Sequence, residues 1–275
     1  MQSGKAIRLN RILPGDGKKA LIVAFDHGFT VGPIPGTENP LEKVRTFVDA
    51  KVDGVLLTPG AFKQYIEPFL KPRAPALLMR LDWTNVWYRP GAVKGDYSSC
   101  LAATVEAAVR NGADAVVTYL FFGAGDPAVE TAEMAKNATV NRECERYGIP
   151  HVVESMARGK NVSDPADPAW IALHTRMASE LGADLIKTDY TGDPATMRAI
   201  VEGCPTPILI AGGPRKASDD DSLALFRGAV EAGAAGVICG RNIFQSGNAA
   251  EFLARARKAL DGGLQPLPPQ ALSTR

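Results

Sequence analysis

The sequence predicts a single (β/α)8 barrel, and three observations carry this prediction. Short apolar runs alternate with segments of helical periodicity eight times along the 275 residues. The apolar runs are continuous, as expected for parallel strands that helices cover on both faces of the sheet. No linker rich in proline, glycine or serine divides the chain. An open, doubly wound sheet is the alternative fold.

The eight predicted strands are of two alternating kinds. Strands of the first kind open with proline or lysine, in "KKALIVAFD" (18–26), "APALLMRLD" (74–82), "IPHVVESM" (149–156) and "TPILIAGG" (206–213). Strands of the second kind follow a glycine or a polar turn, in "KVDGVLLT" (51–58), "NGADAVVTYL" (111–120), "LGADLIKTD" (181–189) and "AGAAGVICG" (232–240). This internal repeat favours a closed barrel over an open sheet.

Helices are predicted around these strands, at 39–51, 59–70, 96–111, 128–147, 167–181, 194–202, 218–231 and 248–260. In the third, Leu101 and Val105 have helical spacing, Ser98 or Ser99 is a possible N-cap, and Gly112 follows the end. The barrel domain is expected to span 1–262. The proline-rich tail, 263–275, is expected to be peripheral or disordered.

Composition excludes several classes of function. The net charge is +1, from 31 basic and 30 acidic residues, so no overall field favours nucleic acid or an anionic membrane. No apolar run approaches the roughly 20 residues that cross a bilayer, and the first residues lack an apolar signal segment, so we expect a cytoplasmic protein. The four cysteines are widely spaced and no histidine cluster accompanies them, which predicts reduced thiols and no metal site.

In a (β/α)8 barrel the active site lies at the carboxyl ends of the strands. Lys187 stands out there, because an ammonium inside a barrel is costly unless it is paired or loses its proton. Desolvation lowers a lysine pKa and yields the amine that forms a Schiff base with a carbonyl. The alternative is a structural ion pair with Asp26, Glu154 or Asp189. The other strand-end candidates are His27, Asp82, Tyr119, Gly212, Gly213, Gly240 and Arg241.

The last two strands end in glycine, in "IAGGPRK" (210–216) and "ICGRNIF" (238–244). Loops at these positions form the usual phosphate site of the fold, completed by a short extra helix that "RNIFQ" would supply. Arg241 would add a charged fork. The alternative is that these glycines serve tight turns only.

The long loop "FDHGFTVGPIPG" (25–36) follows the first strand. Asp26 should point into the barrel mouth and His27 the other way, so His27 is interpreted as a hydrogen-bonded packing residue, or else as part of the substrate site. His151 and His174 are interpreted as structural. The aromatic residues after the third strand, Trp83, Trp87 and Tyr88, either wall the site or bury a subunit contact.

Four motifs in order, "AFDHG", "LIKTDYTGD", "LIAGGPRK" and "GVICGRNIFQ", resemble the archaeal-type class I fructose-bisphosphate aldolases, from about residue 18 to 255. Their relatives include 2-amino-3,7-dideoxy-threo-hept-6-ulosonate synthases and the autoinducer-2 phosphate thiolase. The resemblance implies Schiff-base chemistry without metal or cofactor and a ring-shaped or decameric assembly. It matches Lys187 to the Schiff-base lysine, Asp26 to a proton-transfer aspartate, and the phosphate segment to Gly212, Gly213, Gly240 and Arg241.

The sequence departs from this family on the fifth strand. The aldolases usually have Tyr-Pro-Arg-Gly, with the tyrosine as general acid/base, whereas this chain has "SMARG", with Met156 at the tyrosine position and Arg158 and Gly159 unchanged. A thioether cannot shuttle a proton. Glu154, on the same strand face as Met156, or Tyr119, or a water held by either, is expected to replace it. Burial beside Met156 is expected to raise the pKa of Glu154 toward neutrality.

We therefore predict a Schiff-base aldolase or transaldolase that acts on a phosphorylated ketose or related keto-sugar, with Lys187, Asp26, Glu154 and Tyr119 as catalytic residues. Arg158 and His27 are expected to bind substrate beside the phosphate segment. Two alternatives stay open: a thiolase-like acyl transferase that uses the same lysine, and a phosphosugar-binding barrel without turnover.

Overall fold

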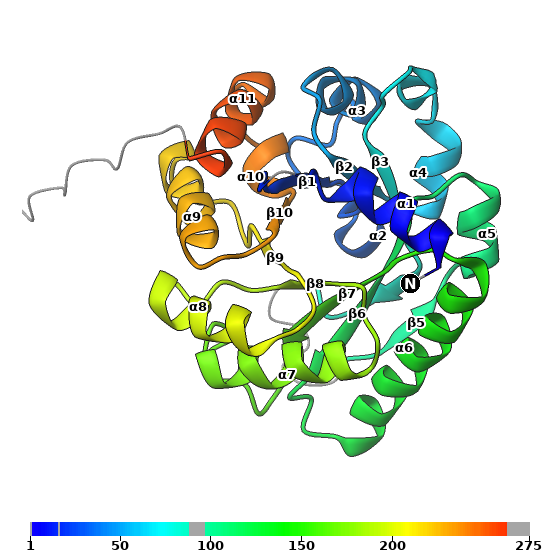
Figure 1. Ribbon diagram of the computed structural model, residues 1–275, viewed down its shortest axis with the longest axis vertical. Helices are drawn as coiled ribbons and strands as arrows, with labels where there is room; N and C mark the ends of the chain where they lie inside the picture. Colours follow the sequence, from blue (N-terminus) through cyan, green and yellow to red (C-terminus); the bar gives the residue numbers. More distant parts are fainter. Residues whose placement is uncertain (1, 16, 88–96, 263–275) are drawn as a thin grey trace, which may run out of the picture.

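The computed structural model describes residues 2–15, 17–87 and 97–262. Within these ranges eight parallel strands close into a barrel, which confirms the predicted fold (Figure 1). Each strand pairs with the next along the chain, and the last pairs with the first. The barrel strands are β1 (Ala20–Ala24), β2 (Gly54–Leu57), β3 (Ala76–Arg80), β6 (Ala115–Phe122), β7 (His151–Ala157), β8 (Leu185–Thr188), β9 (Ile208–Ala211) and β10 (Gly236–Cys239). The predicted tail and Tyr88 lie outside the described residues.

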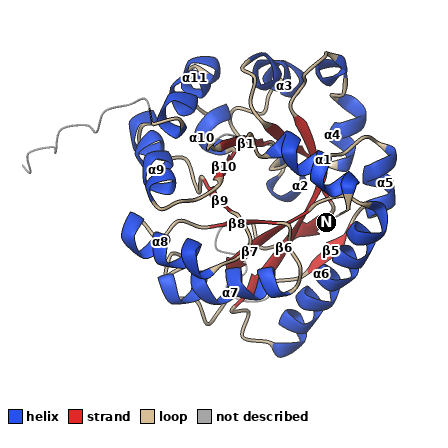
Figure 2. Ribbon diagram, viewed as in Figure 1, coloured by secondary structure: helices blue, strands red, loops and turns tan. Residues whose placement is uncertain are grey.

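Helices surround the barrel (Figure 2). Several of them start after a side-chain cap, such as Asp126, Asp193 and Ser218, whose oxygens accept from N–H groups of the first turn. They are α3 (Pro40–Asp49), α4 (Pro59–Gln64), α5 (Val105–Arg110), α6 (Pro127–Tyr147), α7 (Pro168–Glu180), α8 (Pro194–Gly203), α9 (Asp219–Glu231) and α11 (Ala249–Leu260), with a 3₁₀ turn η1 (Glu67–Leu70) after α4. Two helices of one turn, α2 (Gly28–Val31) and α10 (Arg241–Phe244), follow β1 and β10, and α10 is the short extra helix that the sequence predicts.

The prediction of one helix over 96–111 is wrong. Residues Ser99–Leu101 form strand β5, which pairs antiparallel with β4 (Asp82–Thr84) in a separate two-stranded sheet. The carbonyl of Leu81, just before β4, accepts from the N–H groups of both Ala102 and Ala103, just after β5. Thr104, rather than Ser98 or Ser99, then caps α5. Pairing with a segment 17 positions earlier therefore overrides the local helical spacing.

An N-terminal helix that the sequence analysis does not predict, α1 (Ser3–Ile12), lies across the amino-terminal end of the barrel (Figure 1). Ile12 is fully buried and belongs to the cluster inside the barrel, against which Leu9 and Leu13 also pack. The buried ammonium of Lys5 pairs with Asp184, 2.8 Å away, and with Glu145. Helix α1 is thus a plug that closes the end opposite the predicted active site.

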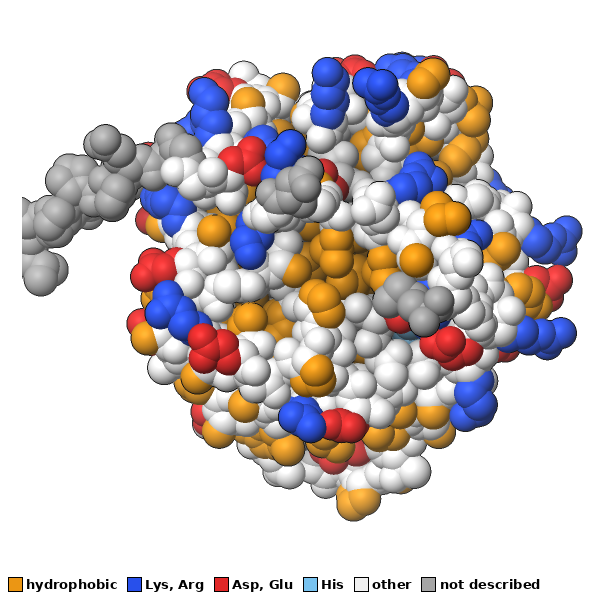
Figure 3. Space-filling model, in the orientation of Figure 1, with side chains coloured by type: hydrophobic (Ala, Val, Ile, Leu, Met, Phe, Trp, Pro, Cys, Tyr) orange, Lys and Arg blue, Asp and Glu red, His pale blue; other side chains and the backbone are white. Residues whose placement is uncertain are grey.

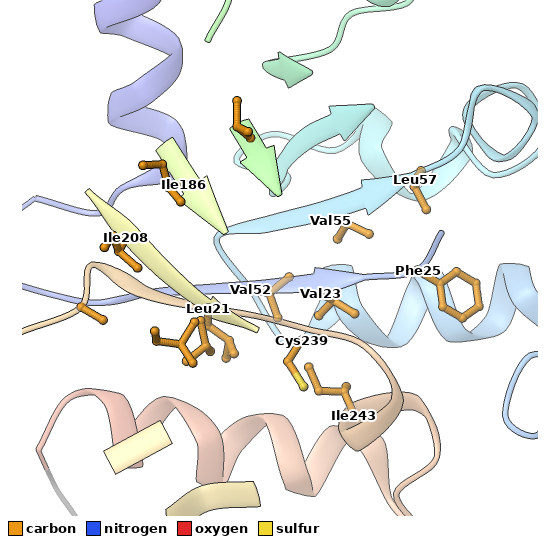
Figure 4. Close-up of a cluster of buried hydrophobic side chains, with 14 of the residues drawn as sticks. Leu21, Val23, Phe25, Val52, Val55, Leu57, Ile186, Ile208, Cys239 and Ile243 are labelled. Atoms are coloured by element: carbon orange, nitrogen blue, oxygen red, sulfur yellow. The ribbon is translucent and has the colours of Figure 1, made fainter. Parts of the chain in front are cut away.

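The apolar core forms two layers. One fills the space between strands and helices and includes Val23, Leu57 and Ile186 (Figure 4). The other fills the barrel interior and includes Ile22, Leu78 and Ile238. Acidic and basic side chains are both spread around the rim of the face in Figure 3, in keeping with the balanced net charge. In the part of the chain described, no helix combines the length and the apolarity that a membrane crossing requires.

Candidate active site

Strand alternation brings four polar side chains together above the apolar interior of the barrel. Leu78, Val117, Val152 and Leu185 lie inside the barrel, and the residues two positions further along the same strands are Arg80, Tyr119, Glu154 and Lys187. All four are buried. The strand register pairs Glu154 with both Tyr119 and Lys187. Neighbouring strands therefore concentrate these groups in one layer.

Lys187 is in contact with Glu154. Its Nζ lies 2.8 Å from Oε1 of Glu154, and the lysine side chain is only 9% exposed. The ion pair that the sequence offered as the alternative to a reactive lysine is therefore present. A carboxylate in contact with a buried amine can also exchange protons with it, so the pair does not exclude a chemical use of Lys187.

The predicted rise in the pKa of Glu154 is wrong. Burial does act to raise this pKa, but the cations of Lys187 and Arg80 outweigh burial and hold it below its usual value. Glu154 is therefore an ionised carboxylate at neutral pH. The prediction failed because the neighbourhood of Met156 suggested an apolar surrounding, whereas the carboxyl group faces two cations.

Arg80 is the residue at this centre that the sequence analysis missed. Its side chain is 1% exposed, its Nε donates to Oδ2 of Asp26 at 2.9 Å, and its Nη2 donates to Glu154. The signal was available, because Arg80 follows Ala76 and Leu78 at a spacing of two and so faces the interior. We call Lys187, Glu154, Arg80 and Asp26 the buried charge network.

Asp26 joins this network, as its place after the first strand predicts. Burial acts to raise its pKa, but Arg80, His27 and Lys187 together lower it. Tyr119 also lies in the layer, in the middle of β6 rather than at the predicted strand end, with its ring 3.8 Å from the guanidinium carbon of Arg80. Burial raises the pKa of Tyr119 well above its usual value, so its phenol is neutral.

Two other strand-end carboxylates have hydrogen-bond partners other than Lys187 and Arg80. Asp82 accepts the Tyr119 N–H at 2.8 Å and the Lys136 ammonium at 2.7 Å, and so binds the wall of the barrel to α6. Asp189 accepts two hydrogen bonds from Arg158, at 2.8 and 3.2 Å. Asp189 is therefore not the ion-pair partner of Lys187.

Met156 shares the inward face of β7 with Glu154, as predicted, and packs in an apolar cluster with Tyr97, Phe121 and Ala211. Trp87 packs against the same cluster, and its ring lies 5.1 Å from the guanidinium carbon of Arg158. Trp87 therefore packs on the wall of this cluster, and a subunit contact through the aromatic residues stays a prediction.

The predicted phosphate segment is closely packed. A Cβ on Gly240 would collide with the His27 ring and the Ala24 carbonyl, and one on Gly212 with Sγ of Cys239. Asn242 holds the two loops together by donating to the carbonyl of Gly212 at 2.8 Å. Gly213 has a φ of +68° and open space at its Cβ position.

Arg241 opens α10, and its buried Nε has no hydrogen-bond partner among the described residues. Burial lowers the pKa of Arg241. A bound anion would accept a hydrogen bond from this Nε, and its negative charge would stabilise the buried guanidinium. The donor set of the segment therefore suits a phosphate group.

His27 differs from its prediction in one respect. Strand β1 ends at Ala24, so strand alternation does not extend to residue 27, which takes helical angles at the start of α2. The ring packs edge-on against Phe244, but its Nδ1 has no hydrogen-bond partner among the described residues and lies 3.7 Å from Oδ1 of Asp26. Burial lowers the pKa of His27 to about 4, so the imidazole is neutral.

The remaining histidines are buried away from this layer. Nε2 of His151 lies 2.7 Å from the Thr118 hydroxyl, whereas neither ring nitrogen of His174 has a partner among the described residues. The cysteines in these ranges are free thiols. No group of three metal-ligating side chains occurs in the described part of the chain.

Residues 20–246 match the family model described as DeoC/LacD family aldolase. An uncharacterised aldolase of Saccharolobus solfataricus is 39% identical over 88% of this chain and 89% of its own length. The 2-amino-4,5-dihydroxy-6-oxo-7-(phosphonooxy)heptanoate synthase of Streptomyces griseus is 33% identical over 88% of this chain and 85% of its own.

A solved structure of an archaeal fructose-1,6-bisphosphate aldolase, whose catalytic lysine carries the carbinolamine intermediate, superimposes with a TM-score of 0.81. It is 30% identical to this chain, and the match covers 92% of this chain and 98% of that one. A closed barrel with a buried lysine at its mouth agrees with these relatives in both sequence and fold. The chain belongs to the DeoC/LacD aldolase family and is a class I, Schiff-base aldolase, a lyase that acts on carbon–carbon bonds.

Proposed function

We propose that Lys187 is the Schiff-base lysine and that the substrate is a phosphorylated ketose or a related keto-sugar. The observation that carries this proposal is the Nζ of Lys187, buried in the barrel mouth and in contact with the Glu154 carboxylate at 2.8 Å. Only an amine without its proton attacks a carbonyl, and Glu154 is placed to accept that proton.

The chemistry then follows from the parts of the layer. The lysine nitrogen adds to the substrate carbonyl, and the resulting carbinolamine loses its oxygen as water to give an iminium ion. A base removes the proton of the substrate hydroxyl two carbons away, the carbon–carbon bond breaks, and its electrons pass to the iminium to form an enamine. The aldehyde product leaves, the enamine is protonated on carbon, and water releases the second product from Lys187.

Glu154 and Tyr119 divide the proton transfers in this scheme. Glu154 is ionised and touches Lys187, so it serves as the base. The neutral phenol of Tyr119 gives the departing hydroxyl of the carbinolamine its proton. Tyr119 regains a proton from Glu154, which took it from Lys187 and is thereby ionised again for the cleavage step. Asp26 faces the same layer and supports the proton transfers as an ionised carboxylate. Met156 has no part in them.

The phosphate group of the substrate would bind to Gly212, Gly213, Gly240 and Arg241. The unpartnered Nε of Arg241 and the open space at the Cβ position of Gly213 support this assignment. Substrate would extend from there toward Arg158 and His27. The S. griseus relative is named a synthase, so the proposed reaction includes formation of the carbon–carbon bond as well as its cleavage.

Borohydride trapping tests this proposal. The protein is incubated with dihydroxyacetone phosphate, reduced with borohydride and digested, and the peptide that contains Lys187 is examined by mass spectrometry. We expect a reduced adduct on Lys187, absent without the ligand and absent in Lys187→Met. An unmodified Lys187 would exclude a triose phosphate as the bound half of the substrate.

The same variant distinguishes a substrate from a ligand that is only bound. If Lys187→Met keeps full affinity for a keto-sugar phosphate and the unsubstituted protein does not turn this compound over, the compound is a bound ligand and not the substrate. A thiolase-like acyl transferase would instead move an acyl group from the ligand to a thiol acceptor. The ring-shaped or decameric assembly and the cytoplasmic location stay predictions, and light scattering on the purified protein checks the first.

A further inference from the structure

We propose that Arg80 is the positioning residue of the site, which holds Glu154 and Asp26 apart and directs the Glu154 carboxylate to Lys187. This inference rests on the proposed function, because it assigns a task to the residue behind the proposed base. Arg80 itself is not a direct contact of Lys187 in the described geometry; it acts through the two carboxylates.

The guanidinium of Arg80 donates to two carboxylates, and its third nitrogen, Nη1, lies near another carboxylate without a hydrogen bond among the described residues. Nε donates to Asp26 at 2.9 Å, Nη2 donates to Glu154, and Nη1 lies 3.6 Å from Oδ1 of Asp82. Glu154 contacts Arg80 through Oε2 and Lys187 through Oε1. The orientation of the proposed base is therefore determined at both oxygens.

The support behind Arg80 is rigid. The Tyr119 ring stacks on its guanidinium, and this ring in turn stacks on Phe121, with 5.0 Å between ring centroids. Asp82 is fully buried and is held by Lys136 and by the Tyr119 N–H. A guanidinium enclosed in this way has little freedom to reorient. A lysine could offer one point charge in place of this planar fork.

Electrostatics gives the fork a second effect. Two carboxylates in one desolvated site repel each other, and Asp26 acts to raise the pKa of Glu154. Arg80 opposes this effect on Glu154 and also lowers the pKa of Asp26. The titratable and charged groups around Glu154 come from different elements of the barrel mouth: Lys187, Arg80, Asp26, Tyr119, His27 and Arg241. Of the cations among them, Arg80 is the one bound to both carboxylates.

Removal of Arg80 should therefore change the pH dependence as well as the rate. Arg80→Met keeps a long, uncharged side chain and should lower kcat by about 10²–10³, with a smaller change in KM. The acidic limb of the kcat/KM profile should move to higher pH by about one unit, because Glu154 loses a cation that lowers its pKa. Arg80→Lys should recover most of the pH profile but only part of kcat.

Lys5→Met is the matched control. Lys5 is also a buried cation between two carboxylates, but it lies at the opposite end of the barrel. The Lys5→Met substitution should lower thermal stability and leave the pH profile of kcat/KM, measured per folded molecule, unchanged. If Arg80→Met is poorly folded, Arg80→Lys decides alone: unchanged kcat in that variant would overturn the proposal.

Two results would contradict the positioning role. One is an acidic limb at the same pH in Arg80→Met and in the unsubstituted protein, with activity lost only in proportion to the unfolded fraction. The other is wild-type kcat in Arg80→Met. Failure of the proposed function looks different, because then borohydride would trap no adduct on Lys187 even with Arg80 in place.

Discussion

Lys187 Nζ and Glu154 Oε1 lie 2.8 Å apart across the neighbouring strands β8 and β7. Glu154 is two positions before Met156. The aldolases that this chain resembles have their acid/base tyrosine at the position of Met156. One step of two residues along a strand is about 6–7 Å. The proton-transfer group of this chain is therefore proposed to lie deeper in the barrel than a tyrosine on the same face would.

Glu154→Gln tests that assignment directly. The amide cannot accept a proton from the lysine or from the substrate hydroxyl, so kcat should fall by about 10²–10⁴ with a modest change in KM. Steady-state kinetics with a keto-sugar phosphate measures both. A comparable loss in Tyr119→Phe, together with normal kcat in Glu154→Gln, would transfer the role to Tyr119.

Gly240→Ala should impair binding of the phosphate group. The added methyl group would meet the backbone of Ala24 and the His27 ring, so the segment that precedes Arg241 must shift. We expect KM for a phosphorylated substrate to rise about tenfold or more, as the loss of one charged hydrogen bond would produce. Gly247→Ala, a few residues further along with open space at its Cβ position, is the control and should bind normally. Equal KM values in the two variants would argue against this phosphate site.

His174→Phe should make the fold less sensitive to acid. Burial lowers the pKa of His174 to about 3 from an unfolded value of 6.5. Between these two pH values the imidazole is protonated in the unfolded chain and neutral in the folded protein. Its contribution to stability is complete above the unfolded pKa and is lost as the pH falls from 6.5 toward 3. Between pH 7.5 and 5 this loss is about 2 kcal/mol.

Phenylalanine keeps an aromatic ring in the parallel stack that His174 makes with Phe122, and it removes the two ring nitrogens that have no partner among the described residues. Urea unfolding at the two pH values should therefore show a smaller difference in the variant. An unchanged difference would mean that other groups, such as His151, carry the acid sensitivity.

Lys5→Met should weaken the plug that α1 forms. The substitution leaves the Asp184 and Glu145 carboxylates without their common cation, and we expect a loss of about 1–3 kcal/mol in the free energy of unfolding. Chemical denaturation at pH 7 measures this loss. The pKa of Lys5 is raised in the fold, so its contribution is complete below its unfolded pKa and disappears as the pH rises beyond the folded one. Unchanged stability at pH 7 would contradict the structural role.

The sequence predicts those features whose signal is local or periodic. The repeat of apolar runs determines the barrel, and a single cation in the run "ADLIKT" identifies Lys187. The features that were missed depend on partners far away in sequence. Strand β5 exists because it pairs with β4, and the role of Arg80 follows from carboxylates 54 and 74 positions away.

The error in the pKa of Glu154 has the same origin. Its neighbours along the strand suggest an apolar surrounding, but its charge state is determined by side chains from β3 and β8. The alternation of side chains along a strand predicts which face of the sheet a residue points to, and this prediction is correct for Glu154 and Met156. Distances across the barrel could not be read, because they depend on how the eight strands close.

The plug formed by α1 also has a kinetic consequence. With the amino-terminal end of the barrel sealed by Ile12 and its neighbours, the carboxyl-terminal mouth is left as the common route of entry and exit. In the proposed cleavage the other half of the substrate stays bound to Lys187 as an enamine, so the free aldehyde leaves first through this mouth. The covalently held product leaves last by the same route, and it should therefore be the competitive inhibitor of substrate binding.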